Sequence, residues 1–125
     1  MATFSAKLVS VEPGRVEISA PVGANCLQQH GFGHAALTFG IGDSAAGYAA
    51  LSVMPLETEV LTSEMKIHLL APARGDMLHA IGRVIKTGKR LVIVQADVFA
   101  CTGSDRSHIA FLTGTMIPVS ATSKA

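Results

Sequence analysis

The sequence has only two cysteines, no excess of charge of one sign, and none of the common glycine-rich catalytic motifs. Cys26 and Cys101 do not form a CxxC pair, and the first ten residues lack the basic start, apolar core and cleavage pattern of a secretory signal. We therefore expect a reducing, cytoplasmic location and treat Cys26 as a packing residue.

Ten basic and nine acidic residues leave a formal net charge of +1. This balance excludes the basic field that favours nucleic acid or an anionic membrane, so any anionic ligand must be held locally. The sequence contains no G-x-S-x-G elbow, P-loop or dinucleotide-binding glycine pattern. Serine hydrolase, nucleotidase and dehydrogenase functions therefore lack the residues they require.

The chain is rich in apolar side chains, which make up 49% of its 125 residues, whereas only 15% are charged. This composition argues against disorder, and the length predicts a single domain over residues 1–125. Some apolar surface is expected to be covered by another subunit, so we predict a homo-oligomer.

Turn residues divide the chain into a predicted hairpin, one helix and four further strands. Pro13 and Gly14 separate the hairpin strands, expected at residues 4–11 and 15–20, and the helical stretch covers residues 34–54. The later strands are expected at residues 59–70, 77–86, 90–100 and 108–118, paired consecutively as an antiparallel meander. The pattern predicts an α+β domain in which a curved antiparallel sheet of about six strands wraps one long central helix.

Asp43 is the one formally charged residue in the apolar stretch of residues 34–54. The stretch could span a bilayer, but it is rich in Ala and Gly and has no flanking basic cluster, so a helix buried by protein is favoured. The helical neighbours of Asp43 are nearly all small, whereas Leu37, Ile41, Tyr48 and Leu51 are expected to supply the core.

The glycines on this helix, Gly40, Gly42 and Gly47, suggest a steric need, because each weakens a helix. Two interpretations of Asp43 stay open at this point. The glycines could allow close packing on the sheet while hydrogen bonds or a subunit contact tie up Asp43. Alternatively, the Asp43 face could leave room for a ligand.

The residues just before and at the start of the expected helix form a recognisable sequence pattern together with Asp43. Residues 28–36 read Gln-Gln-His-Gly-Phe-Gly-His-Ala-Ala, and Asp43 follows His34 by nine residues. This pattern resembles the hotdog-fold acyl-CoA thioesterases, in particular the phenylacetate-degradation (PaaI-like) branch, which carry an Asn, a His-Gly-Gly at the helix start and an Asp nine residues after the His. The resemblance continues through residues 64–73 and 82–89.

The resemblance implies a thioester hydrolase with Asp43 as nucleophile or general base and the Ala35 N–H in the oxyanion hole. Gln28 stands where the family has its Asn, and His34 orders the loop at the helix start. Thr62 is expected to assist from a strand of the facing subunit. Because Ala35 and Ala36 replace the family's two glycines, the alternative is a non-catalytic module that binds acyl-CoA or an aromatic ligand.

A basic cluster flanks the Gly88 turn and is either a solvated hairpin tip or a grip for the phosphates of coenzyme A, with help from Arg74. The expected substrate-binding residues are Gly40, Gly47, Arg83, Lys86, Lys89 and Arg90. His30 and His34 stand four apart, but the glycines between them and the lack of an HExxH motif argue against a metal. No cofactor is expected besides the coenzyme A of the substrate, and the expected assembly is a homodimer or a dimer of dimers.

Overall fold

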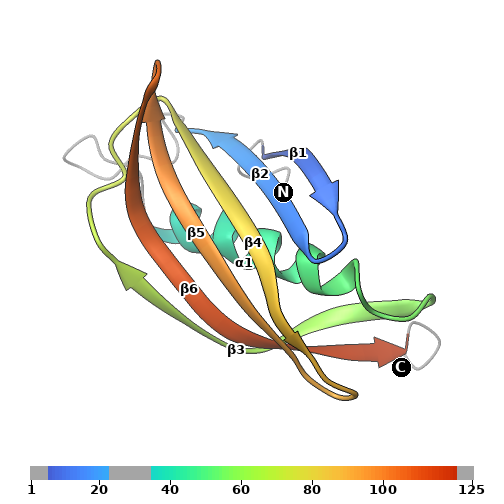
Figure 1. Ribbon diagram of the computed structural model, residues 1–125. Helices are drawn as coiled ribbons and strands as arrows, with labels where there is room; N and C mark the ends of the chain where they lie inside the picture. Colours follow the sequence, from blue (N-terminus) through green and yellow to red (C-terminus); the bar gives the residue numbers. More distant parts are fainter. Residues whose placement is uncertain (1–5, 23–34, 121–125) are drawn as a thin grey trace.

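The computed structural model describes residues 6–22 and 35–120, which form one helix and a six-stranded antiparallel sheet. Figure 1 shows the sheet curving around the helix, with the strands in front and the helix behind them. In chain order the elements are β1 (Lys7–Glu12), β2 (Arg15–Pro21), α1 (Ala35–Leu51), β3 (Thr58–Leu69), β4 (Met77–Thr87), β5 (Val92–Thr102) and β6 (Asp105–Ser120).

The N-terminal hairpin is confirmed, since β1 pairs antiparallel with β2 across a turn at Gly14. Gly14 has a φ of 77°, a conformation that favours glycine, and its N–H donates to the Ser52 hydroxyl beyond the end of α1 at 2.7 Å. The hairpin joins the rest of the sheet through β2, which pairs with β4.

The predicted meander is wrong for β3. The strand order is β1-β2-β4-β5-β6-β3, so β3 lies at an edge and pairs with β6 instead of its chain neighbour β4. The connection from β3 to β4 crosses the ends of β6 and β5, and backbone hydrogen bonds fix it at both sides. Leu70 and Ala71 donate to the Ile109 carbonyl at 2.7 and 3.2 Å, and Asp76 donates to the Cys101 carbonyl at 2.9 Å.

Helix α1 is shorter than the predicted stretch and ends at Leu51. The bonds from Val53 and Met54 to carbonyls three residues earlier tighten the chain after it, and Pro55 cannot continue a helix. The Ser52 hydroxyl donates to the Ala49 carbonyl at 2.6 Å and so links the helix end to the Gly14 turn. No helix in the described residues is long and apolar enough to cross a membrane.

The helix face that packs on the sheet consists mainly of small residues. Leu37 and Ile41 are fully buried as expected, but Tyr48 is 41% exposed, so its predicted place in the core is wrong. Ala45, Ala46, Ala49 and Ala50 are fully buried instead. The reason is a close approach at Gly82 of β4, where a Cβ would lie 2.3 Å from the Ala45 carbonyl carbon. Larger side chains would not fit between this helix and this strand.

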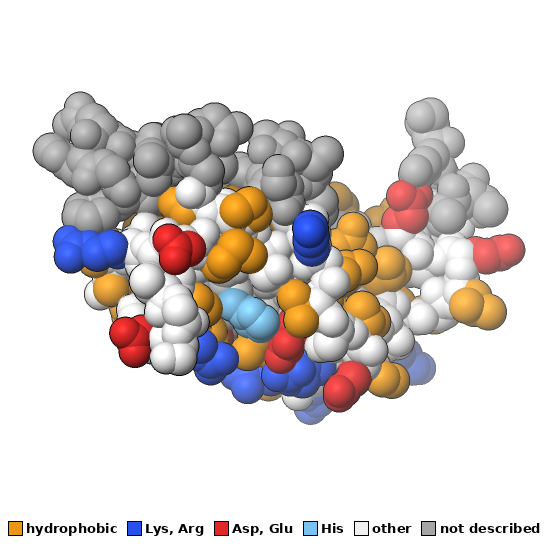
Figure 2. Space-filling model, turned by 90° about the horizontal axis from the view of Figure 1, so that it is seen from above, with side chains coloured by type: hydrophobic (Ala, Val, Ile, Leu, Met, Phe, Trp, Pro, Cys, Tyr) orange, Lys and Arg blue, Asp and Glu red, His pale blue; other side chains and the backbone are white. Residues whose placement is uncertain are grey.

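The sheet face away from the helix carries ion pairs between neighbouring strands. Asp97 of β5 is 9% exposed and contacts Arg83 of β4 at 2.5 Å and His108 of β6 at 3.0 Å. Figure 2 shows acidic and basic side chains mixed over the lower part of the view, without a field of one sign. The charge balance of the sequence is thus also a balance on the surface in view.

Candidate functional site

Asp43 lies near the middle of α1 and faces the edge strand β3. Its Oδ1 atom accepts a hydrogen bond of 2.9 Å from the Thr62 hydroxyl. Thr62 Oγ1 also lies 3.2 Å from the sulfur of Met116, a fully buried β6 residue that pairs with Thr62 across the sheet. The carboxylate is half-buried, and one strand hydroxyl fixes its orientation.

A pocket of about 240 Å³ opens beside this pair. Its lining comes from one helix face and two residues of β3: Asp43, Ser44, Gly47, Tyr48, Val60 and Thr62. The side chains of Val60 and Thr62 point to the same side of β3, toward the helix, because residues two apart share a face of a strand. The pocket therefore combines a carboxylate and hydroxyls with an apolar side chain and an aromatic ring.

Thr62 corrects one expectation from the sequence. It was expected from a strand of the facing subunit, but it contacts Asp43 of its own chain. The reason is the strand order, because β3 follows α1 directly and lies beside β6, where its helix-facing residues reach the middle of α1.

The predicted oxyanion donor lies at the start of the helix, away from this pocket. Ala35 is the first residue of α1 and is exposed, and N–H groups in a first helical turn have no partner within the helix. Asp43 follows Ala35 by eight positions, which corresponds to about 12 Å along a helix. The two groups of one chain thus do not meet at one reacting atom. Gln28 and His34 lie outside the described residues.

Of the predicted substrate-binding residues, Gly47 lines the Asp43 pocket, and the basic ones lie elsewhere on the sheet. Gly40 is on the helix but is not among the residues that line the described pocket. Lys86, Lys89 and Arg90 are exposed at the β4–β5 turn, at the lower right end of the sheet in Figure 1. Arg83 is paired with Asp97 on the face of the sheet away from the helix.

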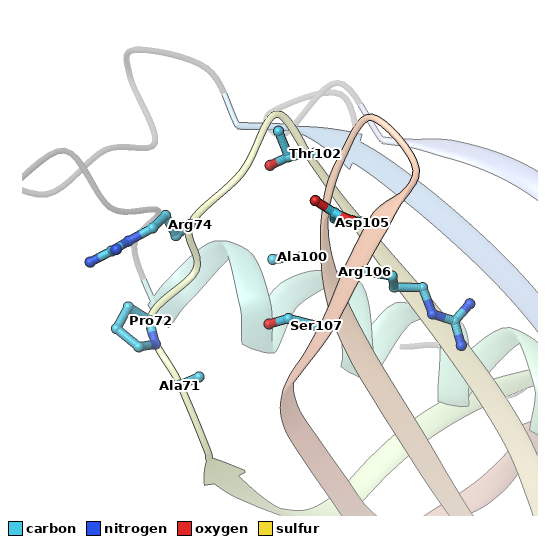
Figure 3. A pocket seen from close by; sticks show the side chains of 8 residues that line it. All are labelled: Ala71, Pro72, Arg74, Ala100, Thr102, Asp105, Arg106 and Ser107. Atoms are coloured by element: carbon cyan, nitrogen blue, oxygen red, sulfur yellow. The ribbon is translucent and has the colours of Figure 1, made fainter.

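A second, larger pocket of about 480 Å³ lies under the crossover between β3 and β4 (Figure 3). It shares no lining residue with the Asp43 pocket. Figure 3 shows Thr102, Asp105 and Ser107 near its centre, while the guanidinium groups of Arg74 and Arg106 point outward on opposite sides. Arg106 stacks over the Phe99 ring at 3.7 Å. None of the catalytic residues predicted from the sequence lines this pocket, as far as the structure describes them.

Sequence reasoning missed three residues of the Asp43 pocket, namely Ser44, Tyr48 and Val60. Tyr48 had a signal that was misread. It is the single tyrosine of the chain and stands in a helix made otherwise of Ala, Gly and a few larger residues. Its polar tip suits a half-exposed position better than a core.

A curved six-stranded antiparallel sheet around one helix is the hotdog fold, and in this protein a helix carboxylate faces a strand hydroxyl. The family comparison agrees with this class. Residues 30–105 match the model of the thioesterase superfamily, and the chain belongs to this superfamily.

Two solved structures have the same fold. A thioesterase family protein from Silicibacter pomeroyi is 39% identical, with 95% of this chain and 88% of that chain covered and a TM-score of 0.93. The E. coli PaaI protein, from the phenylacetic acid degradation operon, is 22% identical over 94% of this chain and 82% of its own, with a TM-score of 0.84. At that identity the second likeness shows the fold alone.

One relative is similar in sequence over part of its length. It is a candidate esterase of Saccharolobus solfataricus, 26% identical over 91 residues. The match covers 73% of this chain and 64% of that protein, so this chain spans less than two thirds of the relative's length.

Proposed function

We propose that the protein is an acyl-CoA thioesterase in which Asp43 supplies the catalytic carboxylate. The observation that carries this proposal is the 2.9 Å hydrogen bond from Thr62 to Asp43 at the mouth of a pocket in a chain of the thioesterase superfamily. Within residues 6–22 and 35–120 this bond engages Oδ1, and we propose that Oδ2 faces the substrate or a water molecule. A carboxylate fixed in this way can serve as a nucleophile or as a general base.

The reaction then proceeds by addition to the thioester carbonyl carbon. As a general base, Asp43 accepts a proton from water while the water oxygen bonds to that carbon; the C–S bond then breaks, and the leaving thiolate takes the proton back from Asp43 and departs as the coenzyme A thiol. As a nucleophile, the Asp43 carboxylate bonds to that carbon and the C–S bond breaks, so coenzyme A leaves as its thiolate; water then hydrolyses the resulting anhydride to the free acid and returns the carboxylate. Both routes place negative charge on the carbonyl oxygen, and both need an N–H donor aimed at it.

The separation between Ala35 and Asp43 supports a site shared by two copies of the chain. Because the two groups lie about 12 Å apart along one helix, we propose that the Ala35 N–H of one copy serves the Asp43 of another. The edge strand β3 is 12 residues long, carries Thr62 and exposes Leu61 and Leu69. An open edge of this kind favours pairing with another chain, in a homodimer or a dimer of dimers.

The basic β4–β5 turn is proposed to hold the phosphates of coenzyme A. Lys86, Lys89 and Arg90 are exposed there, in a chain with almost no net charge, so their positive charge is concentrated locally. Arg83 contributes less, because its pair with Asp97 offsets its charge. The proposal needs no metal or cofactor, and places the enzyme in the cytoplasm, where coenzyme A thioesters are made and used.

A hydrolysis screen over short, long and aryl acyl-CoAs tests this proposal. Released thiol is measured with a thiol reagent, and binding of the same compounds is measured by calorimetry. We expect turnover of at least one group of acyl-CoAs. Binding without turnover would instead establish the non-catalytic module, and neither binding nor turnover would refute both functions.

A further inference from the structure

We propose that Gly47 and Tyr48 determine which acyl group the Asp43 pocket accepts, and that the pocket takes a short-chain or single-ring acyl group. This inference rests on the proposed function and concerns the same site. Its basis is the contrast between two glycines of one helix and the position of one aromatic ring.

The packing of the fold does not require glycine at position 47. A Cβ at Gly42 would lie 2.7 Å from Leu112 Cδ1 and 3.3 Å from Val98 Cγ2, so any larger residue there forces buried core side chains to move. A Cβ at Gly47 would meet its nearest neighbours, Met116 Cε and Val60 Cγ1, at 3.9 Å, an ordinary contact distance. Alanine is the better helix former, so glycine at 47 weakens the helix without relieving a clash. The space that it leaves belongs to the pocket.

The pocket extends from the carboxylate toward Gly47. Asp43 faces Thr62, and one helical turn further Gly47 faces Val60, two residues away on the same strand. One turn of helix and two residues of strand cover nearly the same length, so the Asp43–Thr62 pair and the Gly47–Val60 pair lie side by side along the pocket. The Asp43–Thr62 pair is polar and suits the reacting carbonyl group. The Gly47–Val60 pair is apolar and suits the acyl chain.

Tyr48 lines the same pocket next to Gly47 and is 41% exposed. Its ring provides a flat apolar wall. The volume of about 240 Å³ is below the range of about 300–1,000 Å³ typical of whole small-molecule sites. This volume is the part of the site that one chain provides, and it suits the acyl end of a substrate, while coenzyme A lies outside it.

Two substitutions test the inference by changing the space in opposite directions. Gly47→Ala fills part of the space between Gly47 and Val60, and Tyr48→Ala removes the aromatic ring that lines the pocket. The measured quantity is kcat/KM over a series of straight-chain acyl-CoAs, together with benzoyl-CoA and phenylacetyl-CoA. The chain-length ratio is kcat/KM for the longest accepted straight-chain substrate divided by kcat/KM for the shortest. We expect Gly47→Ala to lower this ratio by about tenfold or more, the effect of one methylene in an apolar pocket. Tyr48→Ala should raise that ratio and admit longer chains.

Leu8→Ala is the control, because Leu8 is an exposed apolar residue of β1, at the sheet edge opposite β3, and does not line the pocket. It should leave the chain-length ratio as in the wild type. If Tyr48→Ala fails to fold, Gly47→Ala alone decides, since its new methyl group meets no clash. An active wild type whose ratio moves in neither variant would overturn this inference and leave the proposed function intact. A wild type without turnover on any thioester would overturn both.

Discussion

Gly82→Ala should destabilise the protein strongly, because the helix lies directly on this residue. A Cβ at position 82 would lie 2.3 Å from the carbonyl carbon and oxygen of Ala45 and 2.5 Å from the Ala46 nitrogen. Carbon atoms in contact prefer about 3.5–4.0 Å, so helix and strand must separate by roughly 1 Å. The atoms that must move are backbone atoms, which cannot rotate away as a side chain can.

The expected magnitude follows from two opposing effects. Overpacking a core costs about 1–3 kcal/mol and occasionally more, and replacing a strand glycine by alanine returns roughly 0.5–1 kcal/mol. Because the clash involves backbone, we expect a net loss near the upper end, at least about 2 kcal/mol in the free energy of unfolding. For a chain of this size that loss lowers the Tm by roughly 6 °C or more.

Urea unfolding at a fixed protein concentration measures this loss, with Gly47→Ala as the internal comparison. The second variant meets only contacts at 3.9 Å and should gain up to about 1 kcal/mol from helix propensity. A Gly82→Ala protein within about 0.5 kcal/mol of the wild type, the range of neutral surface changes, would refute the close helix–sheet contact described above.

Three further predictions concern polar groups. The Arg15 hydrogen bond, followed by the charges of Arg15 and His79, holds the pKa of Glu17 below its usual value. Ionised Glu17 therefore stabilises the fold at pH values above the ordinary glutamate pKa of about 4.3. This stabilisation is lost as the pH falls through the lowered pKa of the folded state. In thermal unfolding, Glu17→Gln should therefore lie below the wild type at neutral pH and converge with it in acid, and a gap that is constant with pH would contradict this. Asp97→Asn should lower the free energy of unfolding by about 1–2 kcal/mol, because Arg83 and His108 share this buried carboxylate but remain partly solvated. An unchanged urea midpoint would show that these ion pairs between strands do not stabilise the fold. Thr62→Val keeps the shape but removes the donor to Asp43, so kcat/KM for thioester hydrolysis should fall about tenfold or more, and wild-type activity would show that this hydrogen bond does not position the carboxylate.

The sequence predicts the elements of this fold well because turn residues separate them. Gly14, Gly88 and Gly103 mark hairpin turns, and the helix contains the long run of Ala and Gly between the N-terminal hairpin and the first later strand. The place of β3 was not predictable in the same way. Alternation along a strand specifies which face is buried but not which strand lies beside it, and the crossover from β3 to β4 is held by backbone bonds to Ile109 and Cys101 that carry no sequence signal.

The site was predictable in part for a similar reason. Asp43 stands out as a lone charge, and the family resemblance assigns its role. The contact with Thr62 of the same chain depends on the strand order and so could not be read from spacing. Tyr48 was assigned to the core because helical spacing takes no account of how closely the sheet approaches, and at Gly82 that approach admits only small side chains.

The most direct test of the central claim is thioester hydrolysis by Asp43→Asn, a change that keeps the size of the side chain and removes its basicity. We expect kcat to fall at least about 100-fold, in line with the loss of a general base or nucleophile, while circular dichroism and solution mass remain those of the wild type. A correctly folded and assembled Asp43→Asn protein that hydrolyses acyl-CoA at the wild-type rate would contradict the assignment of Asp43 as the catalytic carboxylate.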